Sequence, residues 1–227
     1  MNEGFRLSMQ QQRHWRASAA QRKWQGARAL YLIPAYIGSD EIRAALATEI
    51  ARHEILRTST RDSDGLPLQF VLNSVALDWA IEDWRNLSEV EQTIAAAQLH
   101  AFPFDENNFS LNARWIELTK GPALLLSVNG LYGDAASLNV IMSNVLAQVQ
   151  NTPVEYDPVQ FADYAQWQHE LIVDTPEAQA IWRAQSQGSA GRLPLEQGST
   201  DEFQPGAISL KLPAGIIEED LFAAWTW

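Results

Sequence analysis

Four histidines are the side chains of this sequence that titrate nearest to neutral pH, so they are the first candidates for acid–base chemistry or metal binding. They are His14, His53, His100 and His169. Three of them, all except His53, fall inside segments that we expect to be helical, and none has a second histidine nearby at the spacing of metal ligands. We therefore interpret these histidines as surface or packing side chains.

Other common catalytic groups are absent or lack a supporting pattern. The chain of 227 residues contains no cysteine, which excludes disulfides, thiolate nucleophiles and cysteine-based zinc sites. We expect no bound metal, and no glycine-rich phosphate loop is present. Ser127 and Ser137 flank a loop without a nucleophile-elbow pattern, so no Ser-His-Asp triad is indicated. Within that loop, the phenol of Tyr132 is a poor base near neutral pH at its ordinary pKa.

A strand and a helix must position this loop, which covers residues 129–134. Residues 123–128, ALLLSV, are apolar enough to form a central strand. Residues 112–118 predict a second strand, joined to the first by a turn at residues 119–122. After the loop, residues 135–149 predict a helix with one apolar face.

The remainder of the chain alternates between helices and strands in the same way, with short turns between them. Strand–helix alternation with antiparallel hairpins indicates an α/β fold in which a mixed β-sheet packs against helices. In the first third of the chain we expect a helix over residues 7–24, a strand over 27–37 and a helix from Ser39. Two strands follow, over residues 55–60 and 67–72, with a turn at 62–65 between them. A capping box at Ser88 and Glu91 then begins a helix that ends near Phe102, and two more helices are expected over residues 159–173 and 176–187.

Charge and hydropathy narrow the classes of partner. The chain carries 28 acidic and 16 basic residues, a formal net charge of −12 at pH 7. A surface this negative repels phosphate, so we expect no nucleic-acid partner. No apolar run is long enough to span a membrane and the N-terminus lacks an apolar signal core, so we expect no membrane span and a cytoplasmic protein.

Five sequence blocks, taken in order, resemble the condensation domains of nonribosomal peptide synthetases. They are LSMQQQRHW at 7–15, RHEILRT at 52–58, FPFDENNFSLNARWIEL at 102–118, FADYAQWQHELI at 161–172 and IWRAQSQGSAGRLPLE at 181–196. Each block is weak alone, but their order and spacing match the family. The resemblance implies a lobe like that of chloramphenicol acetyltransferase, two of which form a domain with the active site between them.

The resemblance also implies a division of the chain. Residues 1–187 would form the N-terminal, condensation-like lobe, and residues 188–227 would hold a crossover linker and the truncated start of a second lobe. Residues 188–204 are rich in Gly, Ser and Pro, as linkers are. We expect a strand at AISLKLP and a helix at GIIEEDLFAAWTW after them, and the apolar end suggests a chain that has been cut.

The catalytic signature of the family, H-H-x-x-x-D-G, falls on the loop, where this sequence departs from it. Asn129, Gly130 and Asp134 occupy the His, His and Asp positions. The resemblance assigns amide-bond formation to the second histidine, but Gly130 has no side chain that could accept a proton. Asn129 can form hydrogen bonds but does not titrate near neutral pH. We expect no intact catalytic site at this motif, and whether the chain is an enzyme stays open.

The resemblance gives Asp134 a structural role, in which an arginine pairs with the aspartate and holds the motif loop. Arg57, or else Arg52, of the RHEILRT block is the natural partner. We therefore expect an ion pair between Asp134 and one of these arginines. Removing one partner of a buried pair typically costs about 3–5 kcal/mol, so the pair would be important for folding.

Taken together, the resemblance implies a partial, catalytically inactive condensation-like domain of a peptide synthetase or hybrid assembly line, acting as a structural or docking element. Its partners would be adenylation domains and carrier proteins that bear phosphopantetheine, with no cofactor bound directly. Two alternatives stay open: an interface domain that recruits a tailoring enzyme to carrier-bound aminoacyl groups, and an amide-forming acyltransferase completed by a missing lobe. A lone lobe would expose an apolar face, so we also expect a homodimer or another partner contact.

Overall fold

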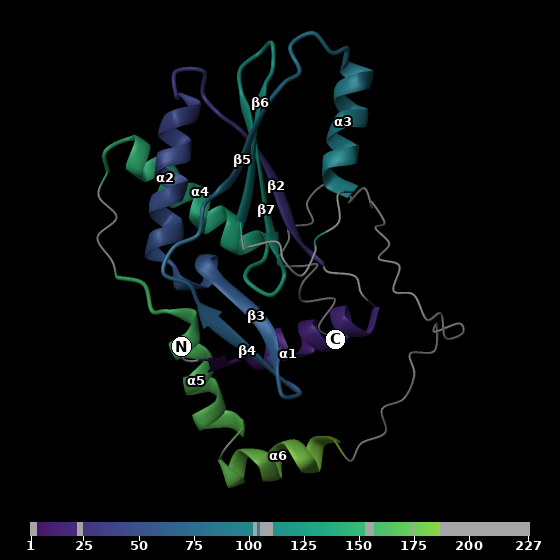
Figure 1. The fold of residues 1–227 in the computed structure, drawn as a ribbon, viewed down its shortest axis with the longest axis vertical. Coiled ribbons are helices and arrows are strands. Elements are labelled where there is room, and N and C mark those ends of the chain that lie inside the picture. The colour runs from purple at the N-terminus through teal and green to yellow at the C-terminus, as the bar shows by residue number, and fades with distance from the viewer. Residues whose placement is uncertain are drawn as a thin grey trace, which may run out of the picture. The chain divides into compact units, whose positions relative to one another are not determined.

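The structure of the chain is a computed structural model that describes residues 4–21, 25–101, 104, 111–152, 157–173 and 175–186 (Figure 1). The linker, strand and helix expected over residues 188–227 lie outside this range. None of the helices in the described ranges is both long and apolar enough to cross a membrane.

The core of the lobe is a four-stranded mixed sheet in the order β2-β7-β6-β5. Its strands are β2 (Gly26–Leu32), β5 (Asp78–Asp83), β6 (Leu111–Glu117) and β7 (Ala123–Asn129). β7 pairs antiparallel with both β2 and β6, whereas β5 runs parallel to β6. All but one of the β7 residues are buried, as its continuous apolar sequence predicts for a central strand.

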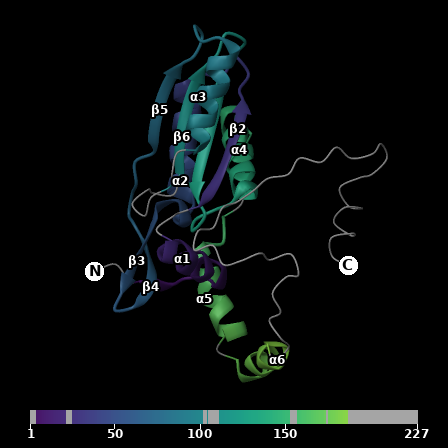
Figure 2. The same cartoon turned by 90° about the vertical axis from the view of Figure 1, so that its right-hand side faces the viewer.

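Helices cover both faces of this sheet (Figures 1 and 2). On one face, α2 (Ser39–Arg52) and α4 (Ala135–Val149) bury Ile42, Leu46 and Leu138 in the main core. On the other face, α3 (Glu89–Ala101) packs Leu99 against a smaller cluster that includes Ile116 and Leu125. The predicted α/β class, a mixed sheet packed with helices, is therefore confirmed.

A second, three-stranded sheet has the order β1-β4-β3 and contains β1 (Phe5–Arg6), β3 (Thr58–Ser63) and β4 (Leu66–Val71). The β3–β4 turn places Asp64 and Gly65 at positive φ, 55° and 84°, which agrees with the predicted Asp-Gly hairpin. The surrounding helical segments are α1 (Met9–Gln21), a 3₁₀ turn (Glu54–Arg57), α5 (Phe161–Gln168), a π-helical turn (His169–Val173) and α6 (Pro176–Ser186).

Several element boundaries differ from the sequence-based expectation. The strand expected over residues 27–37 ends at Leu32, because the chain turns at Pro34, whose carbonyl accepts a hydrogen bond from the Ile37 amide at 2.9 Å. The strand expected from residue 55 begins at Thr58, after the 3₁₀ turn. β1 and β5 were not predicted, whereas α4 has the predicted bounds.

Candidate functional site

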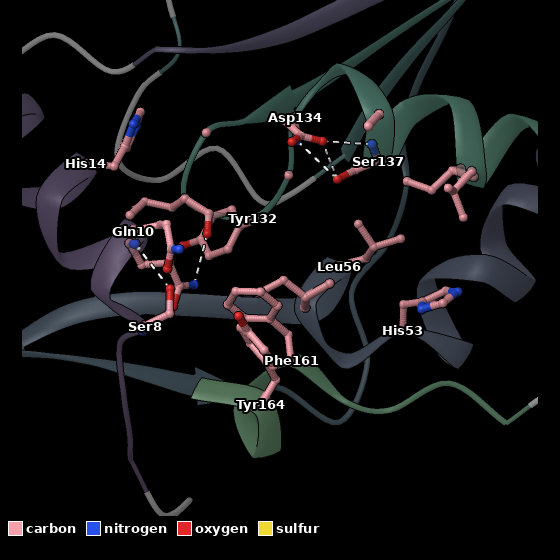
Figure 3. A pocket seen from close by; sticks show the side chains of 18 residues that line it. Ser8, Gln10, His14, His53, Leu56, Tyr132, Asp134, Ser137, Phe161 and Tyr164 are labelled. Atoms are coloured by element: carbon pink, nitrogen blue, oxygen red, sulfur yellow. Dashed lines mark hydrogen bonds between the residues drawn. The ribbon is translucent and has the colours of Figure 1, made fainter. Parts of the chain in front are cut away.

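A pocket of about 740 Å³ opens beside residues 129–134, which we call the motif loop (Figure 3). Four segments that are distant in the sequence form its wall. They are the start of α1, the 3₁₀ turn after α2, the motif loop with the first turns of α4, and the start of α5. The exposed surface of the pocket is mostly apolar, although about half of its lining residues carry polar side chains. The lining residues include Ser8, Gln10, Gln11, His14, His53, Leu56, Tyr132, Asp134, Ser137, Val140, Phe161 and Tyr164.

The first motif position has a structural role. Asn129 is 2% exposed, and its Oδ1 accepts a hydrogen bond from the Leu131 amide at 3.0 Å. Its backbone carbonyl also accepts a bond from the Tyr132 amide at 2.8 Å. The side chain thus folds back on its own loop and stabilises the turn at the end of β7.

Asp134 caps the helix that follows the loop. Its Oδ1 accepts hydrogen bonds from both the amide and the hydroxyl of Ser137, each at 2.8 Å, and Ser137 Oγ accepts from the Asp134 amide at 3.2 Å. This reciprocal arrangement is a capping box at the N-terminus of α4. The bonds from Ser137 hold the pKa of Asp134 below its ordinary value, so the carboxylate is ionised at neutral pH.

Among the described residues, Asp134 forms no ion pair with Arg57, the first of the two arginines that were expected as its partner. Arg57 pairs with Glu54, three residues before it, at 3.2 Å, and it also donates to the Leu72 carbonyl. Arg52, at the end of α2, contributes its charge to lowering the pKa of Glu49. Asp134 is exposed and is already occupied as a helix cap, so it needs no buried cation.

His53 lies beside a buried carboxylate. Its Nε2 is 3.3 Å from Glu49 Oε2, and the Glu49 side chain is 0% exposed. Asn144 and Gln148 of α4 also donate to Glu49, at 2.8 and 2.6 Å. Burial raises the pKa of Glu49, but the hydrogen bonds from His53 and Asn144, together with the charges of His53 and Arg52, bring it below its ordinary value. These hydrogen bonds hold α2 against α4 next to the pocket.

His14, expected to be a surface or packing side chain, lies against the second motif position. A Cβ atom placed on Gly130 would lie only 2.6 Å from His14 Cε1. Both residues line the pocket, where Figure 3 places His14 and His53 at opposite ends. Burial lowers the pKa of His14 more than its hydrogen bond to the Gln25 backbone raises it, so the ring is neutral near pH 7. His14 and Gly130 lie far apart in the sequence, so no sequence pattern could predict this contact.

The other polar groups at and around the loop have identifiable partners or an unsuitable charge state. Gln11 Nε2 donates to the Leu131 carbonyl at 2.9 Å and so fastens α1 to the motif loop. Tyr132 is buried, and burial raises the pKa of its phenol, which makes it a still poorer base. His169 Nε2 lies 2.8 Å from the Leu7 carbonyl, which agrees with its predicted packing role. No cluster of metal-ligating side chains occurs in the described part of the chain.

The chain is similar in sequence to proteins of one known family. The family model described as the condensation domain matches residues 2–223. One of the linear gramicidin synthase proteins of Brevibacillus parabrevis is 32% identical over 169 residues, which is 68% of this chain and 3% of that protein. A probable non-canonical nonribosomal peptide synthetase of Salinispora arenicola is 31% identical over 194 residues, 78% of this chain and 2% of that protein.

Solved structures share the fold at low sequence identity. The starter condensation domain of rhizomide synthetase, solved as a double mutant, aligns with this chain at a TM-score of 0.73 and 18% sequence identity. The alignment covers 87% of this chain and 48% of the rhizomide synthetase chain. The X-domain from teicoplanin biosynthesis has a TM-score of 0.70 at 20% identity, over 87% of this chain and 47% of its own. The chain thus spans about half of these domains and a few per cent of the synthetases. On the family match and these relatives, the chain belongs to the condensation domain family.

Proposed function

We propose that this chain is a condensation-like element of a peptide synthetase that docks carrier domains and binds their phosphopantetheine-linked group, without using the motif histidines of the family. The pocket beside the motif loop carries this proposal. Residues from four separate segments form the wall of this pocket. The motif residues have structural roles instead, because Asn129 stabilises a turn and Asp134 caps a helix. A binding surface therefore persists where the motif residues themselves supply no base.

The pocket suits a long, mostly apolar ligand with a few amide groups. Phe161 and Tyr164 provide aromatic surface at one side, with ring centroids 5.7 Å apart. Polar side chains such as Gln10 and Ser137 also line it. Such a mixture of apolar wall and a few hydrogen-bonding groups is typical of sites for extended cofactor arms.

The proposal is tested by filling the pocket. Val140 lies on the pocket wall and is 51% exposed, so Val140→Trp places an indole in the ligand's path. We expect this variant, in the full-length protein, to bind phosphopantetheine-bearing carrier protein at least about tenfold more weakly. Val90→Trp on α3, also an exposed valine but away from the pocket, is the matched control and should bind as the wild type does. Equal affinity for both variants would refute the proposal.

A second candidate function is recruitment of another protein. The related X-domain from teicoplanin biosynthesis has also been solved in complex with OxyB. In this chain, Trp167 on α5 and Trp182 on α6 are 56% and 57% exposed, and exposed tryptophans are frequent anchors of protein interfaces. If recruitment of a tailoring enzyme is the function, Trp167→Ala and Trp182→Ala will weaken capture of that enzyme while leaving carrier binding unchanged.

A further inference from the structure

The small sheet β1-β4-β3 buries one of its faces, which we call the inner face, against α1 (Figure 2). Gln69 of β4 lies on the inner face, is 1% exposed and accepts a hydrogen bond from Gln11 of α1 at 3.5 Å. The same Gln11 side chain donates to the Leu131 carbonyl of the motif loop. Thr58, on the inner face of β3, is 2% exposed. The inner face is therefore fully occupied by the lobe itself.

The opposite face of this sheet has an apolar centre between two arginines. Leu68 of β4 pairs with Arg6 of β1 on one side and with Arg61 of β3 on the other, so these three side chains point to the same side. Leu66 and Phe70 lie two residues before and after Leu68 and extend the apolar centre. We call these five residues the outer face. Leu66 is 66% exposed, so part of the apolar centre is open to a partner.

Arg61 is held ready to bind a carboxylate. Its guanidinium carbon lies over the Phe70 ring, 3.9 Å from the ring centroid, and Phe70 is only 8% exposed whereas Arg61 is exposed. A guanidinium that rests on an aromatic ring keeps the N–H groups at its edge available for a carboxylate. In the part of the chain that the structure describes, no carboxylate is paired with Arg61.

The charge of the chain limits which anionic partner can use this face. The net charge of −12 at pH 7 repels extended polyanions such as nucleic acids and anionic membranes. A short carboxylate-bearing segment is affected mainly by the nearest charges, since charges beyond about 10 Å are largely screened at 0.1 M salt. Of the acidic residues in the β3–β4 hairpin, Asp62 lies on the inner face, where its Oδ1 accepts a hydrogen bond from the Gly65 amide, and Asp64 lies at the turn. The arginines therefore favour carboxylates at the outer face.

We propose that the outer face binds an acidic, partly apolar segment of another protein. A carboxylate of the segment pairs with Arg61, and its apolar side chains cover Leu66 and Leu68. An Asp or Glu two residues from a Leu suits this face, because side chains at that spacing point the same way in an extended segment. The inference goes beyond the proposed function and does not depend on it, since Gln11, which lines the pocket, contacts the inner face instead.

The test compares three labelled peptides on the full chain by fluorescence anisotropy. Repeats of Asp-Ser-Leu-Ser place acidic and apolar groups on one side, Lys-Ser-Leu-Ser repeats reverse the charge, and Asp-Ser-Ser-Ser repeats remove the apolar group. The first peptide should bind at least about tenfold more tightly than either of the others. Arg61→Gln should weaken its binding about tenfold, and Arg61→Lys should weaken it less because lysine keeps the charge without the planar fork. Arg43→Gln, at an exposed arginine of α2, is the matched control and should change nothing.

The apolar half of the surface is tested separately. Leu66→Ser should weaken binding of the Asp-Ser-Leu-Ser peptide about three- to tenfold, whereas Val90→Ser, at an exposed valine of α3, is the matched control. Thermal unfolding checks that each variant is folded.

Several results would overturn the proposal. They are no binding of the Asp-Ser-Leu-Ser peptide, equal binding of the Asp-Ser-Ser-Ser peptide, or unchanged affinity in Arg61→Gln. Tighter binding of heparin that is lost in Arg61→Gln would point to a polyanion instead of a protein segment. Self-association that is lost in Arg61→Gln, measured by light scattering, would make a second copy of the chain the occupant.

Discussion

Asp134 shows at the residue scale how the motif loop is held without the arginine that the sequence suggested. Its carboxylate accepts two hydrogen bonds from Ser137 at the first turn of α4. We expect Asp134→Ala to lower the free energy of unfolding by about 1 kcal/mol, as the loss of an N-cap usually does. Asp134→Asn keeps an acceptor and should cost less. Urea denaturation of both variants measures this, and a loss several times larger in Asp134→Ala would indicate the buried ion pair after all.

Gly130 is restricted by its neighbour rather than by its backbone angles. Gly130→Ala would push a methyl group into the His14 ring, so we expect it to destabilise the fold by about 1–3 kcal/mol, the usual cost of overpacking. His14→Ala in the same chain removes the ring and should restore part of that loss, while the contact of the methyl group with the Gln25 carbonyl oxygen, at 3.0 Å, remains. Thermal unfolding of the two single variants and the double variant forms a cycle that measures the coupling.

Gly133 provides the control for that cycle. Its added Cβ would lie 3.2 Å from Ser137 Cβ and 3.3 Å from Val128 Cγ2, which is tight but less severe. Gly133→Ala should therefore cost less than Gly130→Ala, and His14→Ala should not rescue it. Additive effects of His14→Ala and Gly130→Ala would mean that the ring moves aside freely.

The sequence could locate the motif loop but could not identify all of its neighbours. Asn129 and Gly130 were predicted at the end of a strand, because the apolar run before them has the composition of a central strand. The contact between His14 and Gly130 depends on how α1 packs against the motif loop. No periodicity or motif in one sequence encodes that contact. The bond between Asp134 and Ser137, by contrast, is a local N-cap pattern that the sequence does contain.

At the scale of elements, the sequence predicted those helices and turns that interactions between neighbouring residues determine. The helix α4 was predicted with its bounds from one apolar face, and the β3–β4 hairpin from its Asp-Gly turn. β5 was missed because its sequence, DWAIED, has acidic ends and only a short apolar centre. Its parallel pairing with β6 joins strands separated by α3, and that register is set by packing rather than by a turn.

Glu49 connects two of these elements and makes their packing depend on pH. It lies on α2 and accepts hydrogen bonds from Asn144 and Gln148 on α4. Its pKa in the folded state lies below the ordinary value of 4.5, so the carboxylate stabilises the fold above that pH and the contribution is lost as pH falls through the folded-state pKa. We expect Glu49→Gln to cost about 1–3 kcal/mol near pH 7.

The cost of Glu49→Gln should shrink in acid, because wild-type Glu49 is then protonated and resembles glutamine. Denaturant unfolding of both proteins between about pH 7 and pH 3 measures this difference. Glu54→Gln is the control, since Glu54 is a partly exposed glutamate that pairs with Arg57 outside this cluster. A cost for Glu49→Gln that stays constant over this range would exclude the carboxylate as its source.

At the scale of the whole molecule, a strongly acidic chain exposes an apolar sheet edge. Among the described strands, β2 lies at the edge of the four-stranded sheet, and Leu30 and Leu32 on it are 55% and 80% exposed. An exposed apolar edge strand favours pairing with another chain, whereas the net charge of −12 at pH 7 opposes association. Because salt screens the repulsion but not apolar contact, association should strengthen as ionic strength rises.

We therefore expect the chain to associate through β2 as its concentration and the salt concentration increase, which light scattering measures directly. Leu30→Lys with Leu32→Lys places charge on the edge strand and should keep the chain monomeric, since edge lysines block strand pairing. Val90→Lys with Ile94→Lys adds the same charge to exposed apolar positions on α3 and should leave association unchanged. If both double variants became monomeric alike, the β2 edge would not be the site of association, because the α3 variant leaves that edge unchanged and lowers the repulsive negative charge by the same amount.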